Sequence, residues 1–280
     1  ASPAMAQVAA GYSEYYIPGD ETNMRLVFNT LDTAGTNYGM HAVIAVTAWS
    51  ANTTVYYDHW EDGYDFDPAN PSTADETVIL ANTGDQRVFE SASIPTNPRG
   101  TTTYYDGGDR IYVAGGVATV TRASWIEAVG VGNQSAAWEI YPIKPQLTAY
   151  ILPFGENLGF VDFNRVFVLV QATADNTTFT VDLNGDGAAD TLNQNRDADK
   201  TDPGDTATVT LQRGQTFLLD RVSACPSGTL CATNPGTLNA GVTIVEHSLG
   251  PNHINFTRGL QPLGTLLANQ GKWQEAELVF

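Results

Sequence analysis

The chain has 280 residues, and 42% of them are apolar, so it can bury a sizeable core as one large β domain or as two smaller units. Its formal net charge is −18, which excludes a nucleic-acid partner, because phosphate binding needs a basic surface. No apolar run approaches the roughly 18 residues of a membrane span, so we expect no membrane insertion.

The chain begins with small, mostly apolar residues. Residues 1–13 read ASPAMAQVAAGYS, a composition that resembles the surroundings of a signal-peptidase cleavage site. We therefore expect a mature chain that is exported via a signal peptide and lies outside the cell or at the cell surface. Residues 1–13 are expected to form a flexible N-terminal arm.

Short segments rich in Val, Ile, Tyr and Thr follow one another and predict β-strands, because each is bounded by Gly, Asn, Asp or Pro. Their spacing of about ten residues is typical of antiparallel β-sandwiches. One short helix is expected, at 263–270. The predicted strands are 26–31, 41–49, 53–59, 76–81, 86–91, 110–115 and 117–125, then 148–153, 165–173, 177–183, 206–212, 215–221 and 241–248.

The two halves of the chain repeat one another. NTTVYYDHWEDG (52–63) aligns without a gap with NTTFTVDLNGDG (176–187), and Asn52 and Asn176 are expected in hairpin turns that need a positive φ. Three more matches keep the same order, which favours two copies of one unit. The sequence therefore predicts an all-β fold of two tandem, internally repeated antiparallel β-sandwich domains, 14–145 and 146–280. The further matches are 14–23 with 149–158, 84–95 with 214–225, and 114–122 with 239–247.

DLNGDGAAD (182–190) has the spacing of a calcium loop, with oxygen ligands at alternate positions and a glycine at the sixth. The twelfth position is Asn193 rather than the glutamate of an EF-hand, so the loop is expected between strands. An Asx-rich turn without metal is the alternative. The predicted calcium ligands are Asp182, Asn184, Asp186, the carbonyl group of Ala188, and Asp190. The candidates to complete the site are Asp197, Asp199, Asp202 and Asp205.

The first copy has DHWEDGYDFD (58–67) in the same place, and a second, weaker metal site is predicted there. Its carboxylates have no basic neighbour in the sequence, so they need a cation, raised pKa values or full solvation. A third acidic turn, YYDGGDR (104–110), is expected to be a glycine-rich hairpin turn, and the alternative is that Asp106 and Asp109 approach the first acidic loop. The weaker site comprises Asp58, Asp62, Asp65 and Asp67.

The same loop combines acids with aromatic rings, which is the composition of a sugar-binding cleft. Tyr56, Trp60 and Tyr64 would then stack on sugar faces, although alternation along a strand would instead place half of the rings in the core. The chain has no GxSxG, HExxH or phosphate-binding glycine motif, so we predict no catalytic residues.

The chain has two cysteines, Cys225 and Cys231, in ACPSGTLCA. Five intervening residues, with a proline and a glycine, can close a small disulfide loop. A disulfide agrees with an oxidising, extracellular setting, and two free thiols are the alternative.

YYDHWEDGYD (56–65), followed by YYDGGDRIYVAGG (104–116), resembles a motif pair of large secreted bacterial surface proteins. These regions are similar to the IgGFc-binding-protein N-terminal region, and the resemblance extends over residues 14–250. It implies an exported, β-rich, surface-associated protein.

We therefore expect a non-enzymatic, calcium-stabilised structural protein that self-assembles into a surface fibre or array. Edge strands, or the alternating C-terminal segment 273–280, would supply the contacts between copies. The partner would then be a second copy of the chain, in a homo-oligomer or polymer. The alternatives are a glycan-binding adhesin and, less favoured, a polysaccharide hydrolase.

Overall fold

The computed structural model describes residues 11–28, 39–94, 100–126, 135–143, 149–152, 167–197, 199–225, 242–246 and 254–258. Most of the regular structure in these ranges consists of strands in antiparallel sheets, with very little helix, which confirms the all-β class. No helix in the described ranges is long and apolar enough to cross a membrane.

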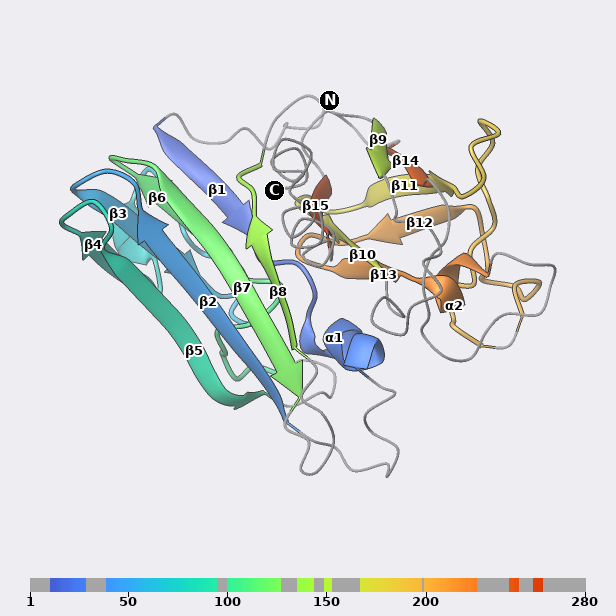
Figure 1. Cartoon of the computed structure of the whole chain (residues 1–280), viewed down its shortest axis with the longest axis horizontal. Helices are drawn as coiled ribbons and strands as arrows, with labels where there is room; N and C mark the ends of the chain where they lie inside the picture. The colour runs from blue at the N-terminus through green and yellow to red at the C-terminus, as the bar shows by residue number, and fades with distance from the viewer. Residues whose placement is uncertain are drawn as a thin grey trace, which may run out of the picture.

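The first half of the chain forms two four-stranded sheets (Figure 1). Alternate residues of the central strand β2 (Met40–Ala48) are buried, as expected for a strand with one face on a core. One sheet has the order β1 (Tyr12–Tyr16), β6 (Arg110–Ala114), β3 (Thr53–Asp58), β4 (Glu76–Leu80). The other has the order β5 (Gln86–Ile94), β2 (Met40–Ala48), β7 (Ala118–Ile126), β8 (Ser135–Ile140).

The second half also forms two sheets, one of four strands and one of three in the described residues. The four-stranded sheet has the order β12 (Thr208–Leu211), β11 (Thr177–Asp182), β14 (Val242–Glu246), β9 (Ala149–Leu152). The other has the order β13 (Thr216–Leu219), β10 (Val168–Ala172), β15 (Ile254–Arg258).

The turns before β3 and β11 have the same geometry, but the prediction that they close hairpins was wrong, because β2 and β3 belong to different sheets, as do β10 and β11. Asn52 has a φ of 58° and Asn176 a φ of 57°, which confirms the predicted positive φ. The following threonine donates a hydrogen bond to the backbone oxygen three residues before it, from Thr53 to Ser50 at 2.8 Å and from Thr177 to Ala174 at 2.7 Å.

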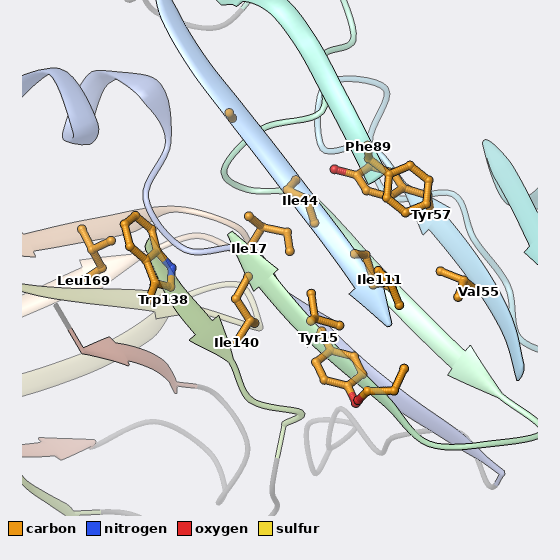
Figure 2. Close-up of a cluster of buried hydrophobic side chains, with 14 of the residues drawn as sticks. Tyr15, Ile17, Ile44, Val55, Tyr57, Phe89, Ile111, Trp138, Ile140 and Leu169 are labelled. Atoms are coloured by element: carbon orange, nitrogen blue, oxygen red, sulfur yellow. The ribbon is translucent and has the colours of Figure 1, made fainter. Parts of the chain in front are cut away.

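Strand β10 is buried on both faces, and its residues belong to two cores. Val168, Val170 and Ala172 pack in the core of the second half, whereas Leu169 packs in the core of the first half. Figure 2 shows Leu169 in one cluster with Ile17 of the first half. Two further residues of the second half, Phe167 and Leu218, join the first core. The two halves therefore share buried apolar surface.

Polar contacts accompany this shared core. Gln171 Nε2 donates to the backbone oxygen of Ile17 at 3.0 Å, and Gly19 N donates to Thr216 Oγ1 at 3.1 Å. Arg213 Nε donates to the hydroxyl group of Tyr16 at 2.8 Å. Each contact joins a residue just after or within β1 to the second half.

Helix α1 (Glu21–Phe28) covers the start of a segment predicted to be a strand, at 26–31. That prediction was wrong for residues 26–28, because Asp20 starts a helix: its Oδ1 accepts a hydrogen bond from Asn23 N at 3.0 Å. Met24 and Val27, one turn apart, face the first core. In Figure 1 the helix lies between the two halves, and it contacts β7 and β13.

A second short helix, α2 (Arg221–Ala224), was also not predicted. Asp220 caps it, accepting hydrogen bonds from Val222 N and Ser223 N, while Ser223 Oγ accepts from Asp220 N. A 3-10 turn, η2, spans Pro71–Thr73. The predicted helix at 263–270 and the C-terminal segment 273–280 lie outside the described residues.

The chain enters β1 earlier than the predicted domain limits suggest. Tyr12 and Ser13, within the expected arm, pair with Ala114 and Val113 in β6, and residues 1–10 lie outside the described range. At the other limit, Ile143 N donates to Glu14 O at 2.8 Å, so the segment just after β8 contacts β1. Residues 144–148, which hold the predicted boundary, lie outside the described residues.

Candidate functional site

The acidic loops that follow β3 and precede β6 meet at one end of their sheet. The two strands are antiparallel neighbours, and Asp58 at the end of β3 pairs in register with Arg110 at the start of β6. The segments 59–66 and 104–109 therefore lie together. The prediction of a hairpin turn at 104–110 was wrong, because β5 and β6 belong to different sheets, and the alternative that Asp106 and Asp109 approach the first acidic loop is confirmed.

Asp109 is the centre of the polar contacts between these loops. Its carboxylate is fully buried, and Oδ2 accepts hydrogen bonds from the Tyr57 hydroxyl group at 2.6 Å and from Asp106 N at 3.0 Å. Oδ1 accepts from Trp60 N at 3.0 Å. His59 Nδ1 lies 3.4 Å from Oδ2. One carboxylate thus holds both loops against β3.

Asp58 is also fully buried, and it pairs with Arg110. Arg110 Nε donates to Asp58 Oδ2, and Phe66 N donates to Asp58 Oδ1 at 3.0 Å. The guanidinium group of Arg110 also lies 4.6 Å from the ring centroid of Tyr64 and 3.6 Å from Glu14 Oε1. The expectation that these carboxylates lack a basic neighbour was therefore wrong for Asp58.

Burial shifts several pKa values in this cluster. It raises the pKa of Asp58, against the opposing charge of Arg110, and it raises the pKa of Glu14, against Tyr112 and Arg110. Burial alone would lower the pKa of His59, but the contact with Asp109 and the charges of Asp75 and Glu61 raise that pKa to about 9.

The weaker predicted metal site is only partly assembled. Carboxylate oxygens of Asp58, Asp65 and Asp75 lie within 4.8 Å of one another. Asp75 was not among the predicted ligands; it directly precedes β4, and its backbone nitrogen donates to Tyr57 O of β3 at 3.1 Å. Asp62 and Asp67 are exposed and outside this set, and Asp67 Oδ1 accepts a hydrogen bond from Ala69 N at 2.8 Å.

The three rings of the sugar-binding alternative are half-buried and contact other side chains. Tyr56 stacks on Phe66 with ring centroids 5.1 Å apart. The guanidinium carbon of Arg213 lies over the ring of Tyr64, 4.8 Å from the ring centroid. Trp60 lies close to the turn that contains Gly214. Two of the three rings thus take part in the contact between the halves.

The predicted calcium loop after β11 is folded by hydrogen bonds from its own backbone. Asp182 accepts from Gly187 N at 2.9 Å and from Gly185 N at 2.7 Å, and these bonds lower its pKa. Asn184 and Asp186 each accept a hydrogen bond from the backbone nitrogen two residues later, which is the pattern of successive Asx turns, and Asp190 accepts one from Leu183 N at 2.7 Å. Calcium binding by Asp182, Asn184, Asp186, Ala188 and Asp190 stays a prediction.

A compact acidic set lies just after this loop. Carboxylate oxygens of four residues come within 4.8 Å of one another there. These are the residues expected to complete the calcium loop: Asp197, Asp199, Asp202 and Asp205.

Cys225 ends α2 with a φ of 42° and is fully buried and disulfide-bonded. Its predicted partner, Cys231, lies outside the described residues.

Three further residues of the first-half cluster escaped the sequence analysis: Glu14, Asp75 and Arg110. Each comes from a different strand or strand end. Asp75 and Arg110 could have been placed beside β3 if the register of β3 with β4 and β6 had been known.

Comparisons with known proteins found no match for this chain: no family model, curated protein or solved structure matches it.

Proposed function

We propose that the chain is a non-enzymatic, extracellular structural protein of two tandem β-sandwich units, stabilised by calcium, that self-assembles into a surface fibre or array. The observation that carries this proposal is β10, whose alternate residues belong to two cores. A protein with such a shared core can transmit load between its units without a flexible linker.

The order of the strands supports two copies of one unit. The sheet β1-β6-β3-β4 has the counterpart β9-β14-β11-β12, and β5-β2-β7 has the counterpart β13-β10-β15. In this comparison β14 takes the place of β6 and β15 that of β7, so the predicted match of 114–122 with 239–247, which aligned β7 with β14, does not follow the strand order. The polar residues of the first-half cluster support a structural role, because Asp58 and Asp109 are buried and engaged in hydrogen bonds within the chain.

The exposed edge of the first half supports contact between copies. β4 is an edge strand among the described strands, and its Ile79 is 67% exposed. An edge strand that presents an apolar side chain is a ready template for another strand. We therefore assign the contact between copies to the β4 edge.

Light scattering and electron microscopy, with calcium and with chelator, test the proposal. Assemblies should form with calcium, and Ile79→Lys should abolish them without changing the fold, whereas the equally exposed Val117→Lys, outside the strands, should not. Calcium should also raise the unfolding temperature, and Asp186→Ala should remove that rise. Monomers at every concentration would refute assembly, and an unchanged unfolding temperature would refute the calcium loop.

A further inference from the structure

We propose that His59, Glu61 and Asp109 bind a divalent transition-metal ion, with zinc as the best fit. The three side chains come from the loop after β3 and from the residue just before β6. This site is separate from the calcium loop, and the proposal does not depend on self-assembly.

The separations of the donor atoms fit one ion. Ligand atoms of the three residues lie within 4.8 Å of one another, and His59 Nδ1 is 3.4 Å from Asp109 Oδ2. Two ligands of a tetrahedral zinc ion, each bonded at ~2.1 Å, are separated by roughly 3.4 Å. A hydrogen bond between nitrogen and oxygen would instead be about 2.7–3.2 Å long. The His59–Asp109 contact thus has the length of a coordination edge.

A buried nitrogen without a hydrogen bond points to the same place. His59 is only 8% exposed, and its Nδ1 makes no hydrogen bond within the described part of the chain, although it lies at ion-pair distance, 3.4 Å, from Asp109 Oδ2. Buried polar atoms nearly always have a partner, so such an atom needs an explanation. An ion between His59 and Asp109 supplies one, binding the neutral imidazole as its Nδ1 proton leaves.

The surroundings of Asp109 are those of an oriented metal ligand. The Tyr57 hydroxyl group, Trp60 N and Asp106 N all donate to its carboxylate, which fixes its direction. The rings of Tyr57 and Tyr105 each lie with centroids 5.0 Å from that of His59 and limit the movement of the imidazole.

The donor set selects the class of ion. One imidazole nitrogen with two carboxylates suits zinc and neighbouring transition metals, whereas calcium takes six to eight oxygen ligands. Two carboxylates balance the charge of a divalent ion when the imidazole is neutral. Three protein ligands leave a fourth position for water. The ion would fasten the loop after β3 to the residue that leads into β6.

Metal titration of the full-length chain tests the proposal. Protein stripped with chelator is titrated with Zn²⁺ by calorimetry and with Co²⁺ by visible absorption, which reports the coordination geometry directly. We expect tight binding at this site, and His59→Gln and Glu61→Gln should each weaken it by at least about tenfold. Glu61→Gln is included because its side chain is only half-buried, so this variant keeps its fold if His59→Gln does not.

Glu139→Gln, an exposed acid on β8, is the matched control and should bind both metals like the wild type. The proposal is overturned if the wild type binds neither ion, or if Glu61→Gln binds with the affinity of Glu139→Gln. Displacement of Co²⁺ by equimolar Ca²⁺ would overturn the assignment to a transition metal.

Discussion

Gln171 of β10 donates a hydrogen bond from Nε2 to the backbone oxygen of Ile17, 3.0 Å away, across the junction of the two halves. The same nitrogen donates to the backbone oxygen of Gly214 at 3.2 Å. Gln171 is fully buried, so a single amide group ties the segment after β1 to the turn between β12 and β13. The junction is part of the protein interior rather than a surface contact.

The shared core predicts that the halves unfold together. Leu169→Ala should lower the free energy of unfolding by about 2–5 kcal/mol, because it leaves a cavity in the first core. The substituted residue itself lies in β10, a strand of the second half. Val170→Ala, the neighbouring residue that faces the second core, is its control. Amide hydrogen exchange in β2 reports the stability of the first half, and exchange in β11 reports that of the second half. In each variant, protection should fall equally in the two strands, and a fall confined to one half would contradict a shared core.

Removal of Arg110 should destabilise the first half strongly. Arg110→Met leaves Asp58 buried and without its ion-pair partner, which costs about 3–5 kcal/mol in comparable buried pairs. Arg87→Met is the control, because Arg87 pairs with Glu76 at 2.7 Å in an exposed setting worth about 0–1 kcal/mol. Urea unfolding measures both changes. Equal losses would show that burial of the Asp58 pair has no energetic consequence.

The turn at Gly214 predicts a measurable contact between the halves. Gly214 has a φ of +81°, and a Cβ atom there would lie 2.1 Å from the Tyr64 hydroxyl oxygen and 2.7 Å from Trp60 Nε1. Gly84 has a φ of +87°, and a Cβ atom there would meet nothing within 4 Å. The two turns are otherwise alike: Gly84 N donates to the backbone oxygen of Ala48 at the end of β2, and Gly214 N donates to that of Ala172 at the end of β10.

Gly84→Ala should therefore lower the free energy of unfolding by the backbone strain alone, about 1 kcal/mol. Gly214→Ala should lower it further, because Tyr64 and Trp60 must also move. Thermal unfolding compares the two variants, and near-ultraviolet circular dichroism reports the aromatic rings. A larger loss in Gly84→Ala than in Gly214→Ala would contradict this packing.

Local patterns predicted much of the fold. The alternation in β2 and the positive φ of Asn52 and Asn176 depend on nearby residues, so the sequence alone was sufficient for them. Helix α1 was missed because Leu26, Val27 and Phe28 also suit a strand, and the capping contact at Asp20 decides between the two.

The candidate site was less predictable, because its contacts connect distant strands. Arg110 lies 52 residues from Asp58, and their meeting depends on the register of β3 with β6. Likewise, the apolar sequence of β10 is typical of any buried strand. Only the packing shows that Leu169 and Val170 belong to different cores.

Glu14 predicts a pH dependence of stability. Burial raises its pKa above the ordinary value of 4.5, and hydrogen bonding from Tyr112 and the charge of Arg110 only partly oppose this. Between the unfolded and folded pKa values the native chain binds more protons than the unfolded chain. The contribution of Glu14 is therefore complete below the unfolded pKa and is lost as pH rises through the folded pKa.

Glu14→Gln keeps the acceptor for the Tyr112 hydroxyl group, 2.7 Å away, but removes the titrating carboxyl group. As the pH rises from acid to neutral, the wild type should lose stability at Glu14 and the variant should not. The free energy of unfolding of Glu14→Gln should therefore rise relative to that of the wild type. Glu90→Gln, an exposed acid on β5, should instead follow the wild-type curve. Urea unfolding at a series of pH values measures all three proteins. Parallel curves for Glu14→Gln and the wild type would show that Glu14 ionises in the folded protein as easily as in the unfolded chain.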